Sequence, residues 1–225
     1  MGTRKSVVMA MLAFMLLSFG SIAMAEDYKA VTVGNYDNVT VMEFTGNYDT
    51  PTIDNPYDAI PRQVIAREFY KIHKDDYDFL VIFSNFDFQM PQTNINGKVY
   101  TAGGFYQNVK NDTAGIGADI LNNSFLYGSN GRLQGTIDMG YVNKKVLDSL
   151  DPGFVDTMTV LSHELLHRWS AYVKFKKWDG SVSKDLLGAD DAHWSFLLDS
   201  QGSMQYGNPW LDNGNGTFTS LAGQR

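Results

Sequence analysis

The sequence contains no cysteine, and it is short of several other residue types. Without cysteine the chain has no disulfides and no thiolate that could bind a metal or act as a nucleophile. Basic residues are outnumbered, since 18 Lys and Arg stand against 25 Asp and Glu for a formal net charge of −7. This balance argues against nucleic acid or an anionic membrane as a partner. Any transition-metal site must therefore use histidine, aspartate or glutamate.

Only one apolar run is long enough to suggest a signal or an anchor, and it lies at the N-terminus. Arg4 and Lys5 precede an apolar stretch over residues 7–23, which ends in the small-x-small pattern of a cleavage site. An uncleaved anchor is the alternative, but the stretch is at the short end for crossing a membrane. The pattern predicts a signal peptide at residues 1–25. Residues 26–225 are then one secreted or periplasmic domain with no stable membrane association.

The most informative stretch is the pentapeptide His163-Glu164-Leu165-Leu166-His167. Histidines four residues apart in a helix lie on one face, one turn apart, where both imidazoles can bind a single metal ion. The flanking sequence predicts such a helix over residues 151–175, because apolar residues recur every three or four positions. Asp151 is the expected N-cap, with Pro152 at the first helical position.

At this motif the chain resembles the zincins, the HExxH zinc peptidases. The resemblance implies one catalytic Zn²⁺ bound by His163 and His167, with Glu164 as general base and a peptide or protein as substrate. It also implies an α+β fold, in which a twisted mixed sheet packs on a backing helix and on an active-site helix carrying the motif, followed by a small irregular C-terminal part. In zincins an edge strand beside this helix pairs with an extended substrate.

Periodicity and turn residues divide the rest of the chain into short elements. The middle third is rich in Asn-Gly and Gly-Gly turns, so its strands should be short. The expected strands are 38–44, 77–86 as a central strand, 98–101, 105–109 and 133–142, and the expected helices are 63–74 and 143–150. We expect the glycine-rich segment 212–217 to be a hairpin turn rather than a calcium loop, because it lacks EF-hand spacing.

A catalytic zinc site commonly takes three protein ligands, so a third is needed. The metzincin pattern would place glycine and histidine where this chain has Ser170 and Val173, so the chain departs from that pattern. His193 is the only histidine downstream of the motif, and we expect it to be the third ligand. The alternatives are carboxylates at Asp190, Asp191 and Asp199.

The segment from Gly202 to Gly207 resembles the Met-turn of astacin-like and serralysin-like metzincins. Carried over by position, Met204 would lie beneath the metal and Tyr206 would stabilise the developing oxyanion. The alternative for Met204 is simple core filling.

Together these features predict an exported zinc metallopeptidase with His163, His167 and His193 as ligands and with Glu164 and Tyr206 as catalytic residues. One alternative is a non-catalytic exported binding protein with a zincin fold. Another is a zinc hydrolase that acts on a non-peptide amide such as cell-wall material.

Overall fold

The computed structural model describes residues 28–50, 59–95 and 97–221, and the expected signal peptide at residues 1–25 lies outside them. Within these ranges none of the helices has the length and apolar character needed to cross a membrane.

The α-helices are α2 (Ala59–Phe69) and α3 (Phe154–Leu166), and the 3₁₀ helices are η2 (Ser124–Tyr127) and η3 (Val142–Lys144). The strands are β1 (Lys29–Tyr36), β2 (Val39–Thr45), β3 (Phe79–Ser84), β4 (Gln92–Ile95), β5 (Lys98–Thr101), β6 (Phe105–Asn108), β7 (Lys110–Asn111), β8 (Leu121–Asn122), β9 (Gly135–Tyr141), β10 (Phe175–Lys176), β11 (Val182–Ser183), β12 (Trp194–Asp199), β13 (Tyr206–Asn208), β14 (Trp210–Asp212) and β15 (Phe218–Ser220).

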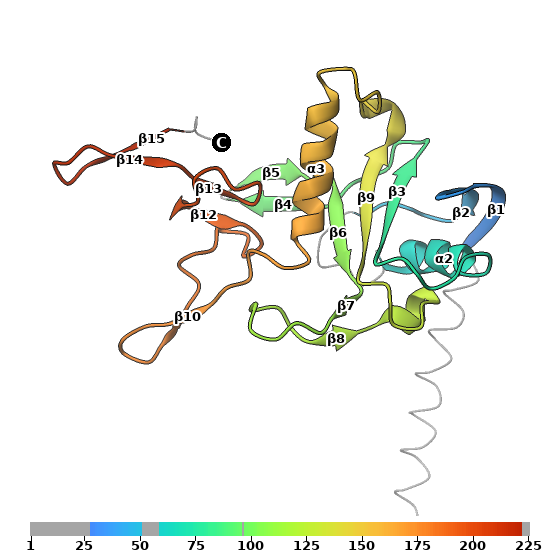
Figure 1. Cartoon of the computed structure of the whole chain (residues 1–225), viewed down its shortest axis with the longest axis horizontal. Coiled ribbons are helices and arrows are strands. Elements are labelled where there is room, and N and C mark those ends of the chain that lie inside the picture. Colours follow the sequence, from blue (N-terminus) through green and yellow to red (C-terminus); the bar gives the residue numbers. More distant parts are fainter. Residues whose placement is uncertain (1–27, 51–58, 96, 222–225) are drawn as a thin grey trace, which may run out of the picture.

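The centre of the molecule is a three-stranded sheet in the order β3-β9-β6 (Figure 1). β3 runs parallel to β9, and β6 runs antiparallel to it. The remaining strands form two-stranded sheets, most of them hairpins such as β1-β2 and β14-β15. The C-terminal hairpins project to one side of the central sheet in Figure 1.

The two α-helices pack on opposite faces of the central sheet. Ile137 and Met139 of β9 form a buried cluster with Tyr106, against which apolar residues of α3 pack. Asp138, between them, instead meets Arg62 of α2, with 2.6 Å between its carboxylate and the guanidinium Nε. Because neighbouring strand residues point to opposite faces, α3 covers one face of β9 and α2 the other.

The buried ion pair between Arg62 and Asp138 is fully enclosed, at 0% and 2% side-chain exposure. Tyr48 closes the network, because its hydroxyl donates to Asp138 and its ring lies under the guanidinium. Loss of one partner would leave a buried charge without its counter-ion, at a cost of about 3–5 kcal/mol.

Several expected elements are present with shifted bounds. The expected strand 38–44 is β2, 98–101 is β5, 105–109 contains β6, and 133–142 contains β9. The predicted helix 63–74 begins earlier, at Ala59, and ends at Phe69. The segment 212–217 joins β14 to β15 as a hairpin turn, with Asn213 N–H donating to the carbonyl of Thr217. The apolar run 77–86 was wrongly predicted to be central, because β9 occupies that place and β3 lies at the edge.

The predicted zincin-like α+β fold is wrong. Such a fold needs a long active-site helix and a backing helix beneath one larger twisted sheet. Small sheets dominate the described residues instead, and α2 and α3 have only 11 and 13 residues. The frequent turns of the middle third limit most strands to two to four residues, so no large sheet forms there.

The motif helix is shorter than predicted at both ends. It begins at Phe154, because the Asp151 carboxylate accepts the Gly153 N–H in a turn before the helix. It ends at Leu166, where Arg168 becomes buried and donates to the side chains of Gln134 and Asn111, both at 2.8 Å. Ala171 then adopts a left-handed φ of 64°, which is incompatible with a continuing helix.

Candidate metal centre

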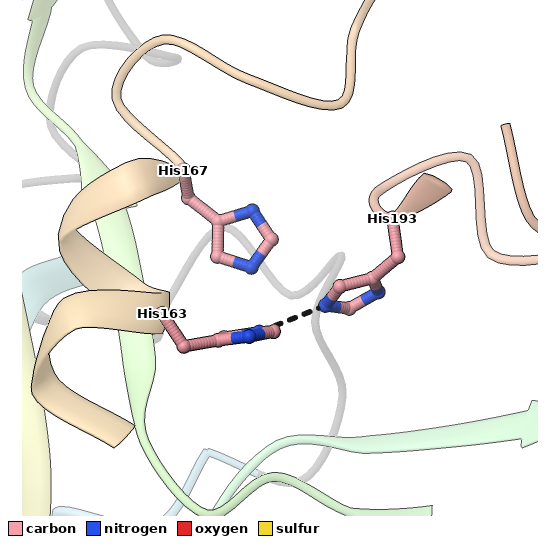
Figure 2. Close-up of side chains that lie close together, drawn as sticks. All are labelled: His163, His167 and His193. Carbon is pink, nitrogen blue, oxygen red and sulfur yellow. Dashed lines mark hydrogen bonds between the residues drawn. The ribbon is translucent and has the colours of Figure 1, made fainter. Parts of the chain in front are cut away.

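Three histidines from two separate parts of the chain converge on one point. His163 lies in the last turn of α3, His167 caps its C-terminus, and His193 lies on the segment just before β12. One ring nitrogen of each lies within 4.8 Å of the others. Figure 2 shows the three rings turned toward a common space. The structure thus brings the expected third ligand to the motif.

The segment that carries Met204 and Gln205 fixes the orientation of His163. The Nδ1 atom of His163 lies 2.7 Å from the carbonyl oxygen of Met204. The Gln205 amide, which is fully buried, donates to the backbone carbonyl of His163 at 2.6 Å. Because a carbonyl can only accept, the proton of a neutral His163 ring is on Nδ1 and its Nε2 lone pair is free.

Asp190 has the same effect on His193. The His193 Nδ1 lies 2.6 Å from Asp190 Oδ2, while Asp190 Oδ1 accepts the N–H groups of Ala192 and His193. Burial opposes the charge of Asp190, but these hydrogen bonds, led by the one from the His193 ring, lower its pKa to about 2. The carboxylate therefore holds the His193 proton on Nδ1 and leaves Nε2 as an acceptor.

This arrangement fits a bound cation. The Nε2 atoms of His163 and His193 lie only 2.9 Å apart (Figure 2). Both rings direct their Nδ1 protons to oxygen acceptors, so two lone pairs face each other if the rings are neutral. A shared metal ion or an added proton must neutralise this repulsion. Three imidazoles without a thiolate are a donor set typical of zinc and other late first-row metals.

Burial favours the uncharged form of the two motif histidines. It lowers the pKa of His163, and together with the neighbouring His193 and His163 it lowers the pKa of His167 to about 3. Neutral rings are required for metal binding, so these two histidines need to release few protons to bind an ion at neutral pH.

Glu164 lies against the edge strand β6 and is 7% exposed. Its Oε2 accepts the backbone N–H of Tyr106 at 2.9 Å. Burial raises the pKa of Glu164 to about 7, against the opposing effects of this hydrogen bond and of Lys145. Lys145 is tied to the same region, since it donates to the carbonyl of Gly103 at 2.9 Å. A carboxyl group with a pKa near neutrality can both accept and donate a proton.

Tyr206 lies at the site, and Met204 contacts it through its backbone. The Tyr206 ring centroid is 4.4 Å from that of His193 and 5.1 Å from that of His163. Its backbone has a left-handed φ of 71°, a strained conformation for an aromatic residue. Met204 is 45% exposed, and its carbonyl oxygen contacts the His163 ring.

The alternative carboxylate ligands have other roles. Asp190 binds the His193 ring, as described above, and Asp191 pairs with Lys184. Asp199 is exposed at the end of β12 and accepts from the backbone of Gln201. The contacts of Asp190 and of the Met204 carbonyl were not anticipated from the sequence. An Asp three residues before a histidine is compatible with an Asx-type turn that presents the carboxylate to the ring, but many such pairs occur by chance.

Comparisons with family models, with curated proteins and with solved structures find no match to this chain. The chemistry of the site must therefore be inferred from its own geometry.

Proposed function

We propose that this protein is an exported zinc-dependent hydrolase that cleaves peptide bonds. The observation that carries the proposal is the convergence of His163, His167 and His193, with Glu164 of the same helix buried nearby. Zn²⁺ bound by three imidazoles supplies Lewis acidity toward a carbonyl oxygen and acidifies water. The predicted signal peptide at residues 1–25 supports export to the periplasm or the medium.

In this proposal Glu164 moves the proton. Its carboxylate accepts a proton from the attacking water and later donates it to the leaving amine nitrogen. The Tyr106 N–H binds Oε2 and so holds the carboxylate in place, which leaves Oε1 for proton transfer. In the metal-free chain burial raises the pKa of Glu164 to about 7, and a carboxyl group with a pKa near neutrality can both accept and donate a proton.

Tyr206 is the proposed stabiliser of negative charge on the substrate oxygen. Its ring lies beside two of the three histidines, and a phenol hydroxyl is a suitable donor to an oxyanion. The strained backbone is held by Ser200, whose hydroxyl donates to the Tyr206 carbonyl at 2.8 Å.

The edge of β6 favours an extended peptide over a small amide as substrate. Within the described residues β6 pairs only with β9, so its other edge carries no strand. The Tyr106 N–H points away from β9 and is bound by Glu164, so a peptide would pair with the outward groups that remain, the Tyr106 carbonyl and, by alternation, the backbone groups of Asn108. A peptide that pairs with this edge would run past Glu164.

The test is the substitution Glu164→Gln in the mature chain. The amide cannot accept the proton, so hydrolysis of a denatured protein substrate should fall by about 10²-fold or more. Zinc content, measured by atomic absorption, should stay near one ion per chain because the three histidines are intact. Retained turnover in this variant would contradict the mechanism.

A second variant, His193→Ala, tests the metal site, and the substrate range of the parent protein separates this proposal from its rivals. Loss of both zinc and turnover is expected. A parent protein that binds zinc but cleaves no peptide from a diverse library would instead indicate a binding protein, and cleavage of cell-wall amides alone would indicate a non-peptide hydrolase.

A further inference from the structure

We infer that Asp190 is a positioning residue that fixes the protonation and the orientation of the third metal ligand, His193. This inference rests on the proposed metal site, and it assigns to Asp190 a role other than that of a direct ligand. The geometry that carries it is the 2.6 Å contact between Asp190 Oδ2 and His193 Nδ1.

Both carboxylate oxygens of Asp190 accept hydrogen bonds, one from the backbone and one from the His193 ring. Oδ1 accepts the backbone N–H groups of Ala192 at 3.1 Å and His193 at 3.2 Å, which shapes the turn. Oδ2 accepts the ring proton. The carboxylate thus ties the backbone and the ring of His193 to one group, and the ring can neither flip nor move its proton to Nε2 without losing the bond.

His193 needs this support more than the other two ligands do. His163 and His167 are held by α3 and its C-terminal turn, whereas His193 lies on a segment without regular structure between β11 and β12. Histidine ligands are commonly oriented by an acceptor on the second ring nitrogen, and loss of that acceptor typically weakens metal binding by 10–100-fold.

The substitution Asp190→Asn tests the role without changing the shape of the side chain. The two backbone N–H groups require an acceptor, so the amide oxygen should keep the Oδ1 position and the NH₂ group should replace Oδ2. An NH₂ group can only donate, so it selects the His193 form with a lone pair on Nδ1 and the proton on Nε2. That form cannot bind a metal through Nε2.

We expect the zinc affinity of Asp190→Asn, measured by competition with a chromophoric chelator, to fall by about 10–100-fold. The matched control is Asp191→Asn, the same change one residue on. Asp191 has a left-handed φ of 56°, which asparagine tolerates, and its carboxylate pairs with Lys184 rather than with a ligand. Zinc affinity in the control should stay within about twofold of the parent.

A second measurement separates positioning from a merely structural effect. Long-range ¹H–¹⁵N correlations of the metal-free protein at pH 8 report which nitrogen of His193 carries the proton. The expected result is Nδ1 in the parent and in Asp191→Asn, and Nε2 in Asp190→Asn. Unchanged zinc affinity in Asp190→Asn overturns the inference, as does weaker binding with the proton still on Nδ1. A parent that binds no zinc removes the proposed function, while the proton position still decides whether Asp190 orients the ring.

Discussion

The immediate surroundings of Glu164 are shaped by a single glycine. A Cβ atom added at Gly104 would lie 2.7 Å from Glu164 Cγ and 3.0 Å from its Oε1. The segment before β6 can therefore approach the carboxylate only because residue 104 has no side chain. The same close approach brings the Tyr106 N–H within hydrogen-bond distance of Glu164.

We predict that Gly104→Ala lowers turnover by about tenfold or more, because the added methyl displaces the carboxylate from its position. Zinc content should not change, since the histidines are not touched. Gly103→Ala is the matched control, because a Cβ there would meet only a Val160 methyl at 4.0 Å. Steady-state kinetics with a peptide substrate measures both variants, and equal turnover in the two would show that Glu164 tolerates the displacement.

The residues of the site differ in how far the sequence predicts them. His163, Glu164 and His167 are predicted by helical spacing, and His193 is predicted as the only histidine downstream of the motif, with Asp190, Asp191 and Asp199 as alternatives. The role of Asp190 does not follow, since it depends on a turn whose shape is set by hydrogen bonds to backbone N–H groups. The contact of the Met204 carbonyl with His163 cannot be predicted from a pattern of side chains either, because a backbone oxygen makes it.

At the scale of elements, the main error in the prediction was the C-terminal end of α3. Trp169 and Tyr172 continue the apolar spacing of the helix, but both lie beyond its last residue. The spacing misleads because the buried Arg168 is anchored to Asn111 and Gln134 of other segments, and these long-range hydrogen bonds outweigh local helical preference.

The proposed metal site also connects two elements that are distant in sequence. His163 belongs to α3, whereas His193 and Met204 belong to the C-terminal segment over residues 187–208, which includes β12 and β13. The hydrogen bonds from His163 Nδ1 to Met204 and from Gln205 to the His163 carbonyl join them. A bound ion would add a further cross-link between α3 and this segment.

We therefore predict that metal removal loosens residues 187–208 more than the central sheet. At a zinc concentration 100 times the dissociation constant, binding stabilises the metal-bound form by about 2.7 kcal/mol. Amide exchange in residues 187–208 should therefore accelerate by up to about 100-fold after chelation. Hydrogen exchange with mass-spectrometric detection measures this, with β9 as the internal reference. Chelator should have no such effect on His193→Ala, and uniform acceleration across the chain would instead indicate global destabilisation.

At the scale of the whole molecule, buried and partly buried tyrosines occur on both sides of the central sheet. Burial raises the pKa of five of them, and for Tyr127 the value rises to about 12, although nearby groups such as Gln63 oppose the shift. The five are Tyr48, Tyr70, Tyr106, Tyr127 and Tyr172. Tyr127 is 3% exposed in the cluster beneath α2, and its hydroxyl donates to Gln107 at 2.9 Å.

This distribution predicts that the protein unfolds in a defined alkaline window. The folded-state pKa of Tyr127 lies above the value of about 10 expected in the unfolded chain. The contribution of the neutral Tyr127 to the free energy of unfolding is therefore fully present below about pH 10. It is lost as the pH rises through about 12. Each such group can lower the free energy of unfolding by up to about 1.4 kcal/mol per pH unit in this window.

Urea unfolding monitored by circular dichroism, repeated from pH 9 to pH 12, tests the prediction, and absorbance near 295 nm reports phenolate formation. Tyr127→Phe should make the free energy of unfolding fall less steeply with pH, by the equivalent of up to one proton. Tyr36→Phe, at a position that is 70% exposed, should leave it unchanged. Because the chain has no cysteine, thiol chemistry at high pH does not complicate the measurement. The chain has twelve tyrosines, so phenolate absorbance that reaches the value for all twelve while the circular dichroism signal is intact would show that these five ionise without unfolding, contrary to the prediction.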